Sequence, residues 1–600
     1  MGKTELMLGN EAVARAVYEA GVSVATAYPG TPSTEITENI AKYGEIYCEW
    51  SPNEKVALEV AVGASIAGAR AICSMKHVGL NVAADPLFTA SYTGTNSGLV
   101  VMVADDPGMH SSQNEQDTRY YGLSAKVPVL EPSDSQECLD FVKIAFDLSE
   151  EFDTPVIVRL TTRVAHSRSL VEVSERQERP LRDYVKNPGK YVMMPAMARA
   201  RHLVVEKRMR LLEQYSEATE INKILYTNDG KAVYGPSGKQ RLGIIASGIS
   251  NQYTMEADIG APVLKLGMVH PLPAGLIRNF ADRFEAVYIV EELSPFIEDF
   301  ARKIGINAIG KEIFPATGEL SAGMIKDKIM GAAEPTATAS AVPATTSASA
   351  EPAQLPTRPP VLCPGCPHRS VFYVLRKMKL IVTGDIGCYT LGALPPLEAM
   401  DTCICMGASV SVAHGIDKAR GKEFASRTVA VVGDSTFLHS GITPLIDIVY
   451  NKGMSTVLIL DNRITGMTGH QQNPSSGFTI KGEEAPRLNI QKLCEAIGVP
   501  SVRKVDPFDV TGLELALKEE LAKECPSVII AERLCALLKT YVPGDEVEID
   551  REKCKRCMQC MKISCAAIVK KDNDLVINKA LCVRCGLCST ICKFGAITKI

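Results

Sequence analysis

The hydrophobic pattern is clearest in the second half of the chain, where two short apolar runs flank a longer apolar segment. The short runs, Thr428–Val432 and Thr456–Leu460, have the length and the β-branched content of buried strands. The segment between them, Leu438–Tyr450, has the length of a helix, and a Gly433-Asp434-Ser435 turn precedes it. The pattern therefore predicts a βαβ unit, whose right-handed crossover makes the two strands parallel.

The polar residues that follow these strands form a candidate magnesium site. Because parallel strands bring their carboxyl ends to one sheet edge, we expect Asp434 and Asn462 to meet there. A carboxylate, an amide oxygen and a loop carbonyl, here that of Ile464, form an oxygen-only ligand set that suits Mg²⁺. Gly433 allows the backbone to approach a diphosphate closely. Two alternatives stay open: Asp434 only caps a helix, or Ser435 is a hydrolase nucleophile, although no Asp-x-x-His partner follows it.

Toward the N-terminus, from Glu5 to about Ala165, helical segments alternate with short apolar runs, which predicts an α/β domain with a mainly parallel sheet. The expected strands are Val22–Ala27, Ala71–Ser74, Leu99–Ala104 and Pro155–Leu160. The first strand leads into a turn at Tyr28–Ile36, where Thr31, Ser33 and Thr34 either cap a helix or bind a carboxylate.

A second polar segment follows the third of these strands. The loop Ala104–Gly122 is densely polar after a buried strand, as loops that bind substrates often are. Within it, Arg119 has the geometry to pair bidentately with a substrate carboxylate, and His110 could orient a substrate or move a proton. The alternative is that both are ordinary solvated loop residues.

Changes in composition divide the chain into segments. The clearest boundary is Ala332–Pro360, where Ala, Pro, Thr and Ser predominate without a buried pattern, so we expect an exposed linker. The expected organisation is an α/β domain over 1–200, a charged helical connection over 201–240, a smaller α/β domain over 241–331, the linker over 332–360, a second parallel α/β domain over 361–543 and an α+β domain over 544–600. The smaller α/β domain has no evident catalytic constellation, and its expected use is structural or at a subunit contact.

Composition narrows the classes of function. The net charge is −4 and there is no extended basic run, so nucleic acid is not expected as a partner. No apolar stretch reaches the roughly 18 residues of a membrane span, and the N-terminus MGKTELMLGN lacks the apolar core of a signal peptide. We therefore expect a cytoplasmic protein without a membrane partner. In that compartment, 19 cysteines indicate metal sites and not disulfides.

Two runs of four cysteines near the C-terminus predict iron–sulfur clusters. The second run has the C-x2-C-x2-C-x3-C spacing of bacterial two-cluster ferredoxins, in which the fourth cysteine of each run ligates the other cluster. The first run has one extra residue before its fourth cysteine, and no proline follows either run. Zinc is the alternative occupant. The predicted ligand sets are Cys554, Cys557, Cys560 and Cys592 for one 4Fe-4S cluster, and Cys582, Cys585, Cys588 and Cys565 for the other.

Four further cysteines could hold a third 4Fe-4S cluster. All four are expected in loops or at strand ends of the domain over 361–543, beside the magnesium site. Alternatively, two of them are free thiols and the adjacent His368 faces a cofactor. The four are Cys363, Cys366, Cys388 and Cys535.

The Gly433-Asp434 turn followed by an Asn-ending dipeptide resembles the diphosphate-binding motif of thiamine diphosphate enzymes, although Asp461 stands where the first Asn is usual. Such enzymes need a carboxyl group in an apolar pocket, where it hydrogen-bonds the aminopyrimidine ring of the cofactor. Glu54, at the start of a helix rich in small residues, is the candidate. Glu49 and Glu59 are alternatives, and a plain acid at a helix N-terminus is the simplest explanation of Glu54.

Thiamine motifs and ferredoxin-type cysteines on one chain resemble the 2-oxoacid:ferredoxin oxidoreductase superfamily, over nearly all residues except the linker. The YPGTPSTEI turn, the CPGCPHR segment and the irregular first cysteine run are similar to its indolepyruvate-oxidising branch. The resemblance implies a pyrimidine-binding domain over 1–200, a transketolase C-terminal-like domain over 241–331, a diphosphate-binding domain over 361–543 and a two-cluster ferredoxin domain over 544–600. Non-redox thiamine decarboxylases lack the clustered cysteines, and a carrier with a vestigial thiamine site would bind iron but no thiamine.

The implied activity is the oxidative decarboxylation of aryl pyruvates to acyl-coenzyme A with reduction of ferredoxin, in an αβ or α2β2 assembly with a smaller beta subunit. Pyruvate or branched-chain 2-oxo acids are the closest alternative substrates. By position, Thr31 and Arg119 match residues that contact the substrate carboxylate, and Ile464 matches the carbonyl ligand of Mg²⁺. Pyruvate enzymes have an Asn near Met467, and a deformable apolar side chain there would suit a bulkier substrate.

Overall fold

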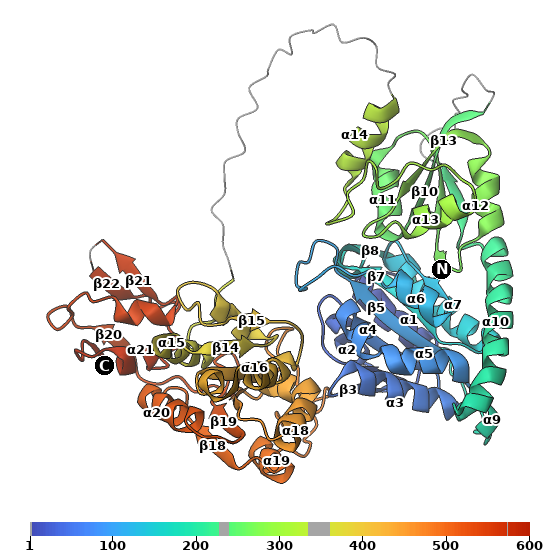
Figure 1. The fold of residues 1–600 in the computed structure, drawn as a ribbon. Coiled ribbons are helices and arrows are strands. Elements are labelled where there is room, and N and C mark those ends of the chain that lie inside the picture. The colour runs from blue at the N-terminus through green and yellow to red at the C-terminus, as the bar shows by residue number, and fades with distance from the viewer. Residues whose placement is uncertain (1–2, 227–238, 334–359, 573, 600) are drawn as a thin grey trace, which may run out of the picture. The chain divides into compact units, whose positions relative to one another are not determined.

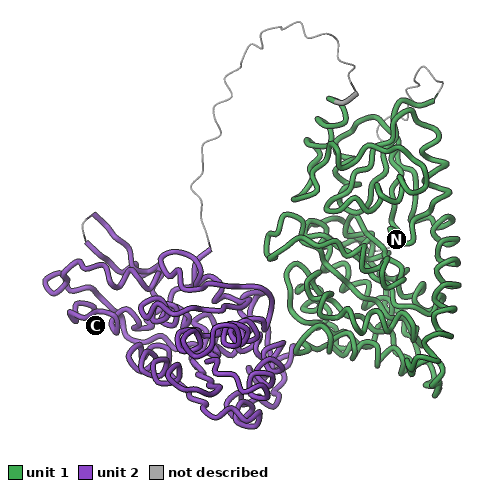
Figure 2. Tube along the Cα trace, viewed as in Figure 1, with its two compact units in different colours: residues 1–343 green, residues 344–600 purple. Residues whose placement is uncertain are grey.

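The computed structural model describes residues 3–226, 239–333, 360–572 and 574–599 of the chain. These residues form two compact units, unit 1 within residues 1–343 and unit 2 within residues 344–600 (Figures 1 and 2). Nearly all of the predicted linker, 334–359, lies outside the described residues. In the part of the chain that is described, no helix has both the length and the apolar character needed to cross a bilayer.

The main sheet of unit 1 confirms the α/β prediction for the N-terminal region. Its strand order is β12-β6-β7-β5-β4-β2-β3, and all neighbouring pairs are parallel except β12 with β6. The strands are β2 (Val24–Ala27), β3 (Tyr47–Trp50), β4 (Ala71–Lys76), β5 (Leu99–Asp105), β6 (Val129–Leu130), β7 (Val156–Thr161) and β12 (Met268–His270). Polar residues that follow β2, β3, β4 and β5 therefore share one edge of the sheet.

Small residues let the helix α3 (Glu54–Ile66) pack closely on this sheet. Asn53 caps the helix by accepting a hydrogen bond from the backbone of Val56 (2.9 Å). Ala57 and Ala61 are fully buried in one core with alternate residues of β4, as the period of a strand requires. The other helices around the sheet are α1 (Gly9–Glu19), α2 (Thr34–Ile40), α4 (His77–Val82), α5 (Ala84–Thr93), α6 (Arg119–Ala125), α7 (Ser135–Phe152) and α8 (Thr162–His166), and β1 (Lys3–Leu8) pairs antiparallel with β8 (Arg168–Val173).

The smaller α/β region has a four-stranded sheet in the order β13-β10-β11-β9, with β9 antiparallel at its edge. Because β12 from the same region joins the seven-stranded sheet, the two sheets belong to one unit. The strands are β9 (Lys223–Tyr226), β10 (Gln240–Ser247), β11 (Pro262–Leu266) and β13 (Phe284–Val290), and the helices are α11 (Gly248–Ala257), α12 (Ala274–Ala281), α13 (Phe296–Lys303) and α14 (Ala322–Ala333).

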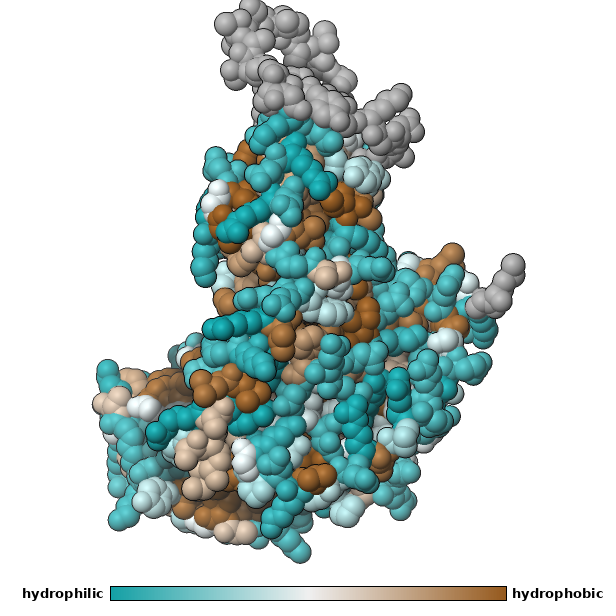
Figure 3. Space-filling model, turned by 90° about the vertical axis from the view of Figure 1, so that its right-hand side faces the viewer, coloured by the Kyte–Doolittle hydropathy of each residue, from teal (hydrophilic) through white to brown (hydrophobic). Residues whose placement is uncertain are grey.

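The expected helical connection over 201–240 is only partly helical. After the short helix α9 (Pro188–Tyr191), the long helix α10 (Pro195–Ala218) begins before residue 201, and the segment that follows it supplies strand β9 to the sheet. The hydrophobic periodicity of the sequence did not predict β9, because this strand forms by pairing with β11, which is distant in sequence. On the face that carries α10, hydrophilic residues alternate with scattered hydrophobic patches (Figure 3).

Unit 2 contains a six-stranded parallel sheet in the order β15-β14-β16-β17-β19-β18. The neighbours β16 and β17 run in register from Val429 opposite Thr456 to Gly433 opposite Leu460, which confirms the predicted βαβ unit. The predicted helix begins as α17 (Asp434–Thr436) and a π-helical turn (Phe437–Gly441) before α18 (Ile442–Tyr450). The strands are β14 (Ile381–Gly384), β15 (Thr402–Cys403), β16 (Thr428–Gly433), β17 (Thr456–Asp461), β18 (Ser501–Val505) and β19 (Ser527–Glu532), and the other helices are α15 (His368–Met378), α16 (Ala408–Ala425), α19 (Ile490–Ile497) and α20 (Val510–Leu521).

The C-terminal part of unit 2 has the predicted α+β character. Two antiparallel pairs, β20 (Val547–Ile549) with β23 (Ile597–Lys599) and β21 (Ile568–Lys571) with β22 (Asp574–Ile577), frame the cysteine loops. A 3₁₀ turn (Gln559–Ile563) and α21 (Leu587–Ile591) contribute Cys560 and Cys588 to a small apolar core. The cysteine runs therefore lie against buried side chains and not on a solvated tail.

Candidate cofactor and cluster sites

The diphosphate-binding turn lies where β16 ends. Gly433 is the last residue of β16, and an added Cβ there would lie 2.7 Å from the ring of Tyr389, so a larger side chain would have to displace that ring. Asp434 opens α17 and is buried. Asn462 follows β17, the neighbouring parallel strand, and is also buried. The topology therefore places Asp434 and Asn462 at the same edge of the sheet, as predicted.

Side-chain hydrogen bonds fold the loop after Asn462 onto this turn. Ser475 Oγ donates to Asp434 Oδ2 (2.6 Å), and Thr465 Oγ1 donates to Ser435 Oγ (2.9 Å). The backbone N–H of Ile464 donates to Asn462 Oδ1 (3.1 Å), which fixes the segment that carries the Ile464 carbonyl. Ser435 is thus bonded to the loop that covers the turn, a structural use that a hydrolase nucleophile does not require.

The electrostatics of the turn fit a cation. Burial, and then the neighbouring Asp461, raise the pKa of Asp434 to about 7. The pKa of Asp461 is also raised, first by burial and then by Glu532. A divalent cation between such groups would compensate the buried charge and favour the ionised form. The donor set of one carboxylate, one amide and one loop carbonyl therefore suits Mg²⁺.

Two residues that support this edge were not assigned that role from the sequence. His368 Nε2 lies 3.3 Å from Asn462 Nδ2, and burial lowers the pKa of His368 to about 4, so the neutral ring can accept the amide hydrogen. Asp385 follows β14 and accepts hydrogen bonds from the backbones of Gly407 (2.9 Å) and Ser409 (3.0 Å). The CPGCPHR segment signalled His368, whereas no local pattern marked Asp385, whose partners lie at the start of α16.

In unit 1, Glu54 is the buried carboxylate among the three candidates. It lies at the first position of α3, and its Oε1 would be only 2.5 Å from a Cβ added at Gly79, so the carboxylate lies against the backbone of α4. Glu59, by contrast, is exposed and paired with Lys55. Glu49 accepts hydrogen bonds from Ser51 and from Tyr47, which is itself exposed. Burial therefore favours Glu54 for the predicted role.

The turn after β2 and the loop after β5 are joined near Thr31. Ser111 Oγ donates to the carbonyl of Thr31 (3.1 Å), and Ser33 Oγ donates to the carbonyl of Gly30 (2.7 Å). Ser33 precedes α2 without a capping side-chain bond, which contradicts the helix-cap alternative for this residue. Thr34 Oγ1 is buried without a hydrogen-bond partner among the described residues.

A buried cation, Lys76, lies between this turn and this loop. It ends β4, and its Nζ donates to the Ser111 carbonyl (2.8 Å). Its stem packs on Gly30, where an added Cβ would lie 3.0 Å from Lys76 Cβ. Burial lowers the pKa of Lys76 to about 8, against the opposing effect of Asp106. No motif marked Lys76 as a functional residue, although its place at the end of an apolar strand was a usable signal.

The next residue, His77, is buried as well. Its Nε2 lies 3.2 Å from the Asn114 carbonyl, and its Nδ1 has no hydrogen-bond partner in the described part of the chain. Burial lowers the pKa of His77, so a neutral ring is favoured. Lys76 and His77 together place two nitrogen groups at the edge that carries Glu54.

The structure contradicts the predicted role of Arg119 in binding a substrate carboxylate. Its side chain is fully buried and bound bidentately to Asp117 (2.9 and 2.6 Å), and Nη1 donates to Glu291 (2.6 Å). Nη2 also donates to the carbonyls of Glu292 and Ser294 (both 3.1 Å). The guanidinium therefore joins the two sheets of unit 1, and each of its three nitrogens bonds to described residues of the protein.

His110 also differs from its predicted role. Its Nε2 lies 3.1 Å from Glu319 Oε2, and the side chain is 45% exposed. Glu319 pairs in addition with Arg163 at 2.7 Å. His110 is thus tied to a surface ion-pair group near the smaller α/β region and not to the buried groups around Lys76.

The eight C-terminal cysteines gather in the two predicted sets. Burial raises the pKa of Cys560, and the thiols that add to this effect are Cys557, Cys592 and Cys554. Burial likewise raises the pKa of Cys588 to about 12, and the contributing thiols are Cys585, Cys565 and Cys582. Each set therefore includes the fourth cysteine of the other run. The second set also lines one cavity, together with apolar residues and Arg369.

The four additional cysteines converge at the sheet edge beside Asn462. Burial raises the pKa of Cys388 to about 11, and the nearby thiols of Cys535 and Cys363 add to this effect. Burial also raises the pKa of Cys366, and the thiols of Cys388 and Cys535 contribute to that rise. The backbone N–H of Cys535 donates to the Asn462 carbonyl (3.3 Å). In the described ranges, no three His, Cys, Asp or Glu side chains converge on a single metal ion. A four-iron cluster needs wider spacing, because each thiolate binds a different iron.

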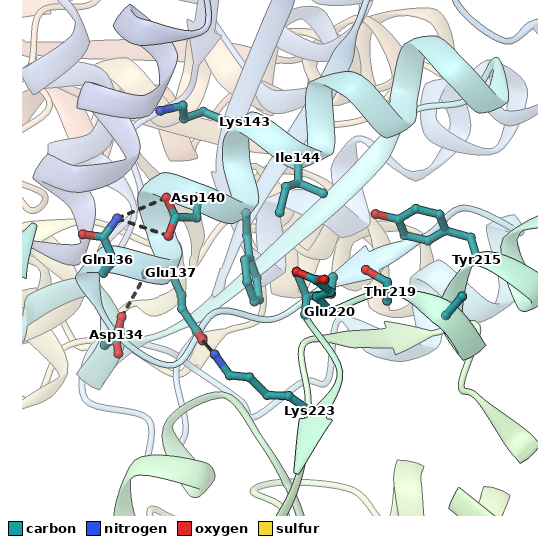
Figure 4. A pocket seen from close by; sticks show the side chains of 13 residues that line it. Asp134, Gln136, Glu137, Asp140, Lys143, Ile144, Tyr215, Thr219, Glu220 and Lys223 are labelled. Atoms are coloured by element: carbon teal, nitrogen blue, oxygen red, sulfur yellow. Dashed lines mark hydrogen bonds and ion pairs between the residues drawn. The ribbon is translucent and has the colours of Figure 1, made fainter. Parts of the chain in front are cut away.

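Unit 1 also has a hollow of about 900 Å³ between α7, the end of α10 and β9 (Figure 4). Its lining mixes carboxylates with lysines, and Gln136 bonds to Asp140 across one wall (3.1 Å). Glu137 pairs with the buried Lys265 and lies 3.7 Å from Lys223. No residue of the predicted catalytic set lines this hollow.

Comparison with known proteins finds three related domains along the chain. The family model "Pyruvate flavodoxin/ferredoxin oxidoreductase, thiamine diP-bdg" matches residues 15–229, "Thiamine pyrophosphate enzyme, C-terminal TPP binding domain" matches 385–531, and "4Fe-4S binding domain" matches 575–598. Indolepyruvate oxidoreductase subunit IorA of Archaeoglobus fulgidus is 40% identical over 99% of this chain and 97% of its own length. The subunit of that name from Methanothermobacter marburgensis is also 40% identical, with the same coverage.

Among solved structures, a 2-oxoglutarate:ferredoxin oxidoreductase from Magnetococcus marinus aligns with 55% of this chain and 65% of its own. The TM-score is 0.45 and the sequence identity 17%, a similarity too weak to transfer a site.

Proposed function

The chain belongs to the family of indolepyruvate oxidoreductase subunit IorA, and from this premise we propose that it oxidatively decarboxylates aryl pyruvates to acyl-coenzyme A and reduces ferredoxin. It is a thiamine diphosphate-dependent oxidoreductase with a 4Fe-4S binding domain. The proposed assembly pairs it with a smaller beta subunit. The alternatives are pyruvate or branched-chain 2-oxo acids as substrates.

The observation that supports the proposal best is the continuity of sites within unit 2. The Asn462 carbonyl accepts a hydrogen bond from the backbone of Cys535, which belongs to the same set of four cysteines as Cys363. Arg369, in the segment that follows Cys363, lines the cavity of the second ferredoxin set. Electrons released at the diphosphate edge would therefore have cysteine-held iron at each step toward the C-terminal domain. A non-redox thiamine enzyme has no use for this arrangement.

The residues of the chain would divide the chemistry as follows. Asp434, Asn462 and the Ile464 carbonyl would hold Mg²⁺ and orient the diphosphate, while the 462–475 loop covers them. Glu54 would hold a proton at the aminopyrimidine ring from its buried position. When bound, thiamine diphosphate supplies the carbon nucleophile and accepts the electrons of the leaving carboxylate.

Lys76 is the proposed partner of the substrate carboxylate, in place of Arg119. Lys76 is a buried cation whose stem packs on Gly30 in the Thr31 turn and whose ammonium donates to the Ser111 loop. Among the described residues its hydrogen bonds go to neutral acceptors, the carbonyl and hydroxyl of Ser111, so a carboxylate can still complete its three-donor shell. Thr31 would contribute from the same turn, as the resemblance implies.

The decisive experiment is an anaerobic assay of the full chain co-expressed with its smaller subunit. Coenzyme A-dependent reduction of ferredoxin is measured with indolepyruvate, phenylpyruvate, pyruvate and 2-oxoisovalerate. The proposal expects kcat/KM for both aryl substrates to exceed that for pyruvate by at least roughly 100-fold, about 2.7 kcal/mol of discrimination. Equal or better use of pyruvate or 2-oxoisovalerate would overturn the aryl assignment, and decarboxylation without ferredoxin reduction would overturn the redox assignment.

The number of clusters is tested on the same preparation by analysis of iron and acid-labile sulfide. About eight irons per chain correspond to two four-iron clusters, and about twelve correspond to three. The gathering of Cys363, Cys366, Cys388 and Cys535 beside Asn462 favours twelve. Substitution of Cys535 by Ser should then remove about four irons and leave the C-terminal clusters in place.

A further inference from the structure

Arg369, the second residue of α15, is a fully buried cation between two cysteine sets. Its Nε donates to the Cys363 carbonyl (2.8 Å). Its Nη1 donates to the carbonyls of Ile563 (3.2 Å) and Ser564, directly before Cys565. One guanidinium thus joins the CPGC loop at the sheet edge to the loop that carries a ligand of the second ferredoxin set.

The third nitrogen of this guanidinium is unused by the protein. Nη2 is buried and makes no hydrogen bond to any of the described residues. Leaving a buried N–H of a charged group unpaired is costly, so a partner that the polypeptide does not supply is expected. Arg369 also lines the cavity formed with Cys565, Cys582, Cys585 and Cys588.

The charges around Arg369 come from sulfur. Burial lowers its pKa, and the groups that oppose this effect are Cys565, Cys366, Cys363 and Cys585. The described residues include no carboxylate in an ion pair with Arg369, unlike Arg119, which has two. A cluster bound to four thiolates is negatively charged and exposes sulfur acceptors, so it matches both the charge and the orphan donor.

We propose that Arg369 is a positioning residue that donates its Nη2–H to a sulfur of the cluster held by Cys565, Cys582, Cys585 and Cys588. The proposal rests on the proposed function for the presence of that cluster. The same side chain holds the Cys363 loop beside this cluster. The cluster is therefore the entry point for electrons into the C-terminal domain. The cluster of Cys554, Cys557, Cys560 and Cys592 would then be the exit toward ferredoxin.

The physical consequence is a raised reduction potential. A hydrogen bond to sulfur and a nearby positive charge stabilise the reduced, more negative cluster. Arg369→Gln should therefore lower the potential of one cluster, so that at a fixed applied potential its ratio of reduced to oxidised form falls about tenfold, or about 59 mV for one electron. Arg369→Lys keeps the charge but not the planar donor geometry, and a smaller fall is expected.

The measurement is a dithionite titration of the anaerobic holoenzyme followed by EPR, with iron counted for every variant. Arg376→Gln is the matched control, because Arg376 lies on the same helix but is about half exposed and pairs with Glu398. Full iron with unchanged potentials in Arg369→Gln would overturn the proposal. The titration uses no 2-oxo acid, so an enzyme that fails on indolepyruvate but holds its clusters still tests Arg369.

A second measurement on the wild-type holoenzyme covers the case in which the variants lose iron or fail to fold. With ¹⁵N in arginine guanidinium groups, pulsed EPR of the reduced protein should detect a nitrogen coupled to one cluster. Two other arginines of these loops are paired with carboxylates, Arg556 with Asp574 and Arg584 with Glu546. Absence of any guanidinium coupling would overturn the proposal, and absence of iron would overturn the proposed function with it.

Discussion

The carboxyl edges of the two parallel sheets are built in different ways. In unit 2, one loop after β17 returns to the β16 turn through side-chain hydrogen bonds, Ser475 to Asp434 and Thr465 to Ser435. In unit 1, the groups at the edge come from four strands, and the cation among them is the buried Lys76. A site made by consecutive strands leaves a motif in the sequence, whereas a site assembled from many strands does not.

This difference explains which predictions succeeded. The GDS turn and the Asn-ending dipeptide belong to one βαβ unit, so spacing alone placed Asp434 and Asn462 at one edge. In unit 1 the exposed appearance of the Ala104–Gly122 loop suggested Arg119, but the fold buries that side chain against Asp117 and Glu291. Experiments that treat the two edges differently can therefore break or sharpen the comparison.

The largest expected effect is at Glu54. Glu54→Gln keeps the size of the side chain but removes its proton exchange, so kcat should fall by roughly 10² to 10⁴ with thiamine diphosphate still bound. Steady-state rates and the cofactor content of the purified variant measure this. Glu59→Gln, on the exposed side of the same helix, is the control and should match the wild type. A Glu54 variant with normal kcat would remove the carboxylate from the mechanism.

At the unit 2 edge, Asp434→Asn should have opposite effects on cofactor binding and on the thermal stability of the metal-free protein. Loss of a direct ligand should weaken magnesium-dependent cofactor binding by at least roughly 100-fold, beyond the effect typical of an outer-shell partner. In the metal-free protein, by contrast, the variant should have the higher Tm at pH 8, because burial raises the pKa of Asp434 to about 7 and its ionised form is disfavoured there.

The direction of the pH effect on stability follows from the linkage between proton binding and folding. The folded pKa lies above the unfolded value of about 3.9, so the metal-free wild type loses stability as pH rises from about 4 through about 7. Thermal unfolding with and without cofactor and Mg²⁺ measures both effects. The exposed Asp447→Asn on α18 is the control. An Asp434 variant that is stabilised by cofactor as strongly as the wild type would contradict the magnesium assignment.

Arg119→Met tests the correction made at the unit 1 edge. It leaves Asp117 and Glu291 buried without their cation, and should cost about 3–5 kcal/mol in the free energy of unfolding. Denaturant titration measures the loss, while KM for the 2-oxo acid in the folded fraction should be unchanged. A stable variant with a raised KM would return Arg119 to the substrate site.

Lys76→Met should show the opposite pattern. Loss of one charged hydrogen bond to the substrate carboxylate should raise KM by roughly 10- to 100-fold, with a smaller change in kcat and partial rescue in Lys76→Arg. Steady-state kinetics, together with Tm to confirm folding, separate this from damage to the Ser111 loop. Unchanged KM in a folded variant would exclude Lys76 from carboxylate binding.

The smallest effect is expected at Met467, which is 54% exposed at the end of the loop segment after Ile464. Met467→Asn should shift the ratio of kcat/KM values toward pyruvate and away from indolepyruvate by up to about tenfold, since a single contact of this kind gives limited discrimination. Met467→Leu is the conservative control and should keep the aryl preference. An unchanged ratio in the Asn variant would mean that specificity is set elsewhere.

The sequence by itself determined the fold class, the βαβ unit that carries Asp434 and Asn462, and the grouping of the eight C-terminal cysteines. These features depend on strand periodicity and on fixed spacings, which short-range geometry converts directly into structure. It also placed Glu54 at a helix start, although not the burial that distinguishes it from Glu49 and Glu59.

Only the tertiary structure decided what the long polar side chains do. Arg119, Lys76, Arg369 and Asp385 each bond to at least one group distant in sequence, and for Arg119 and Arg369 these groups include backbone carbonyls that no residue type announces. A guanidinium or ammonium group reaches several ångströms from its backbone, so its role follows from where the fold directs it. Thus Arg119 became a structural ion pair, while Arg369 was left with a donor for which the polypeptide has no acceptor.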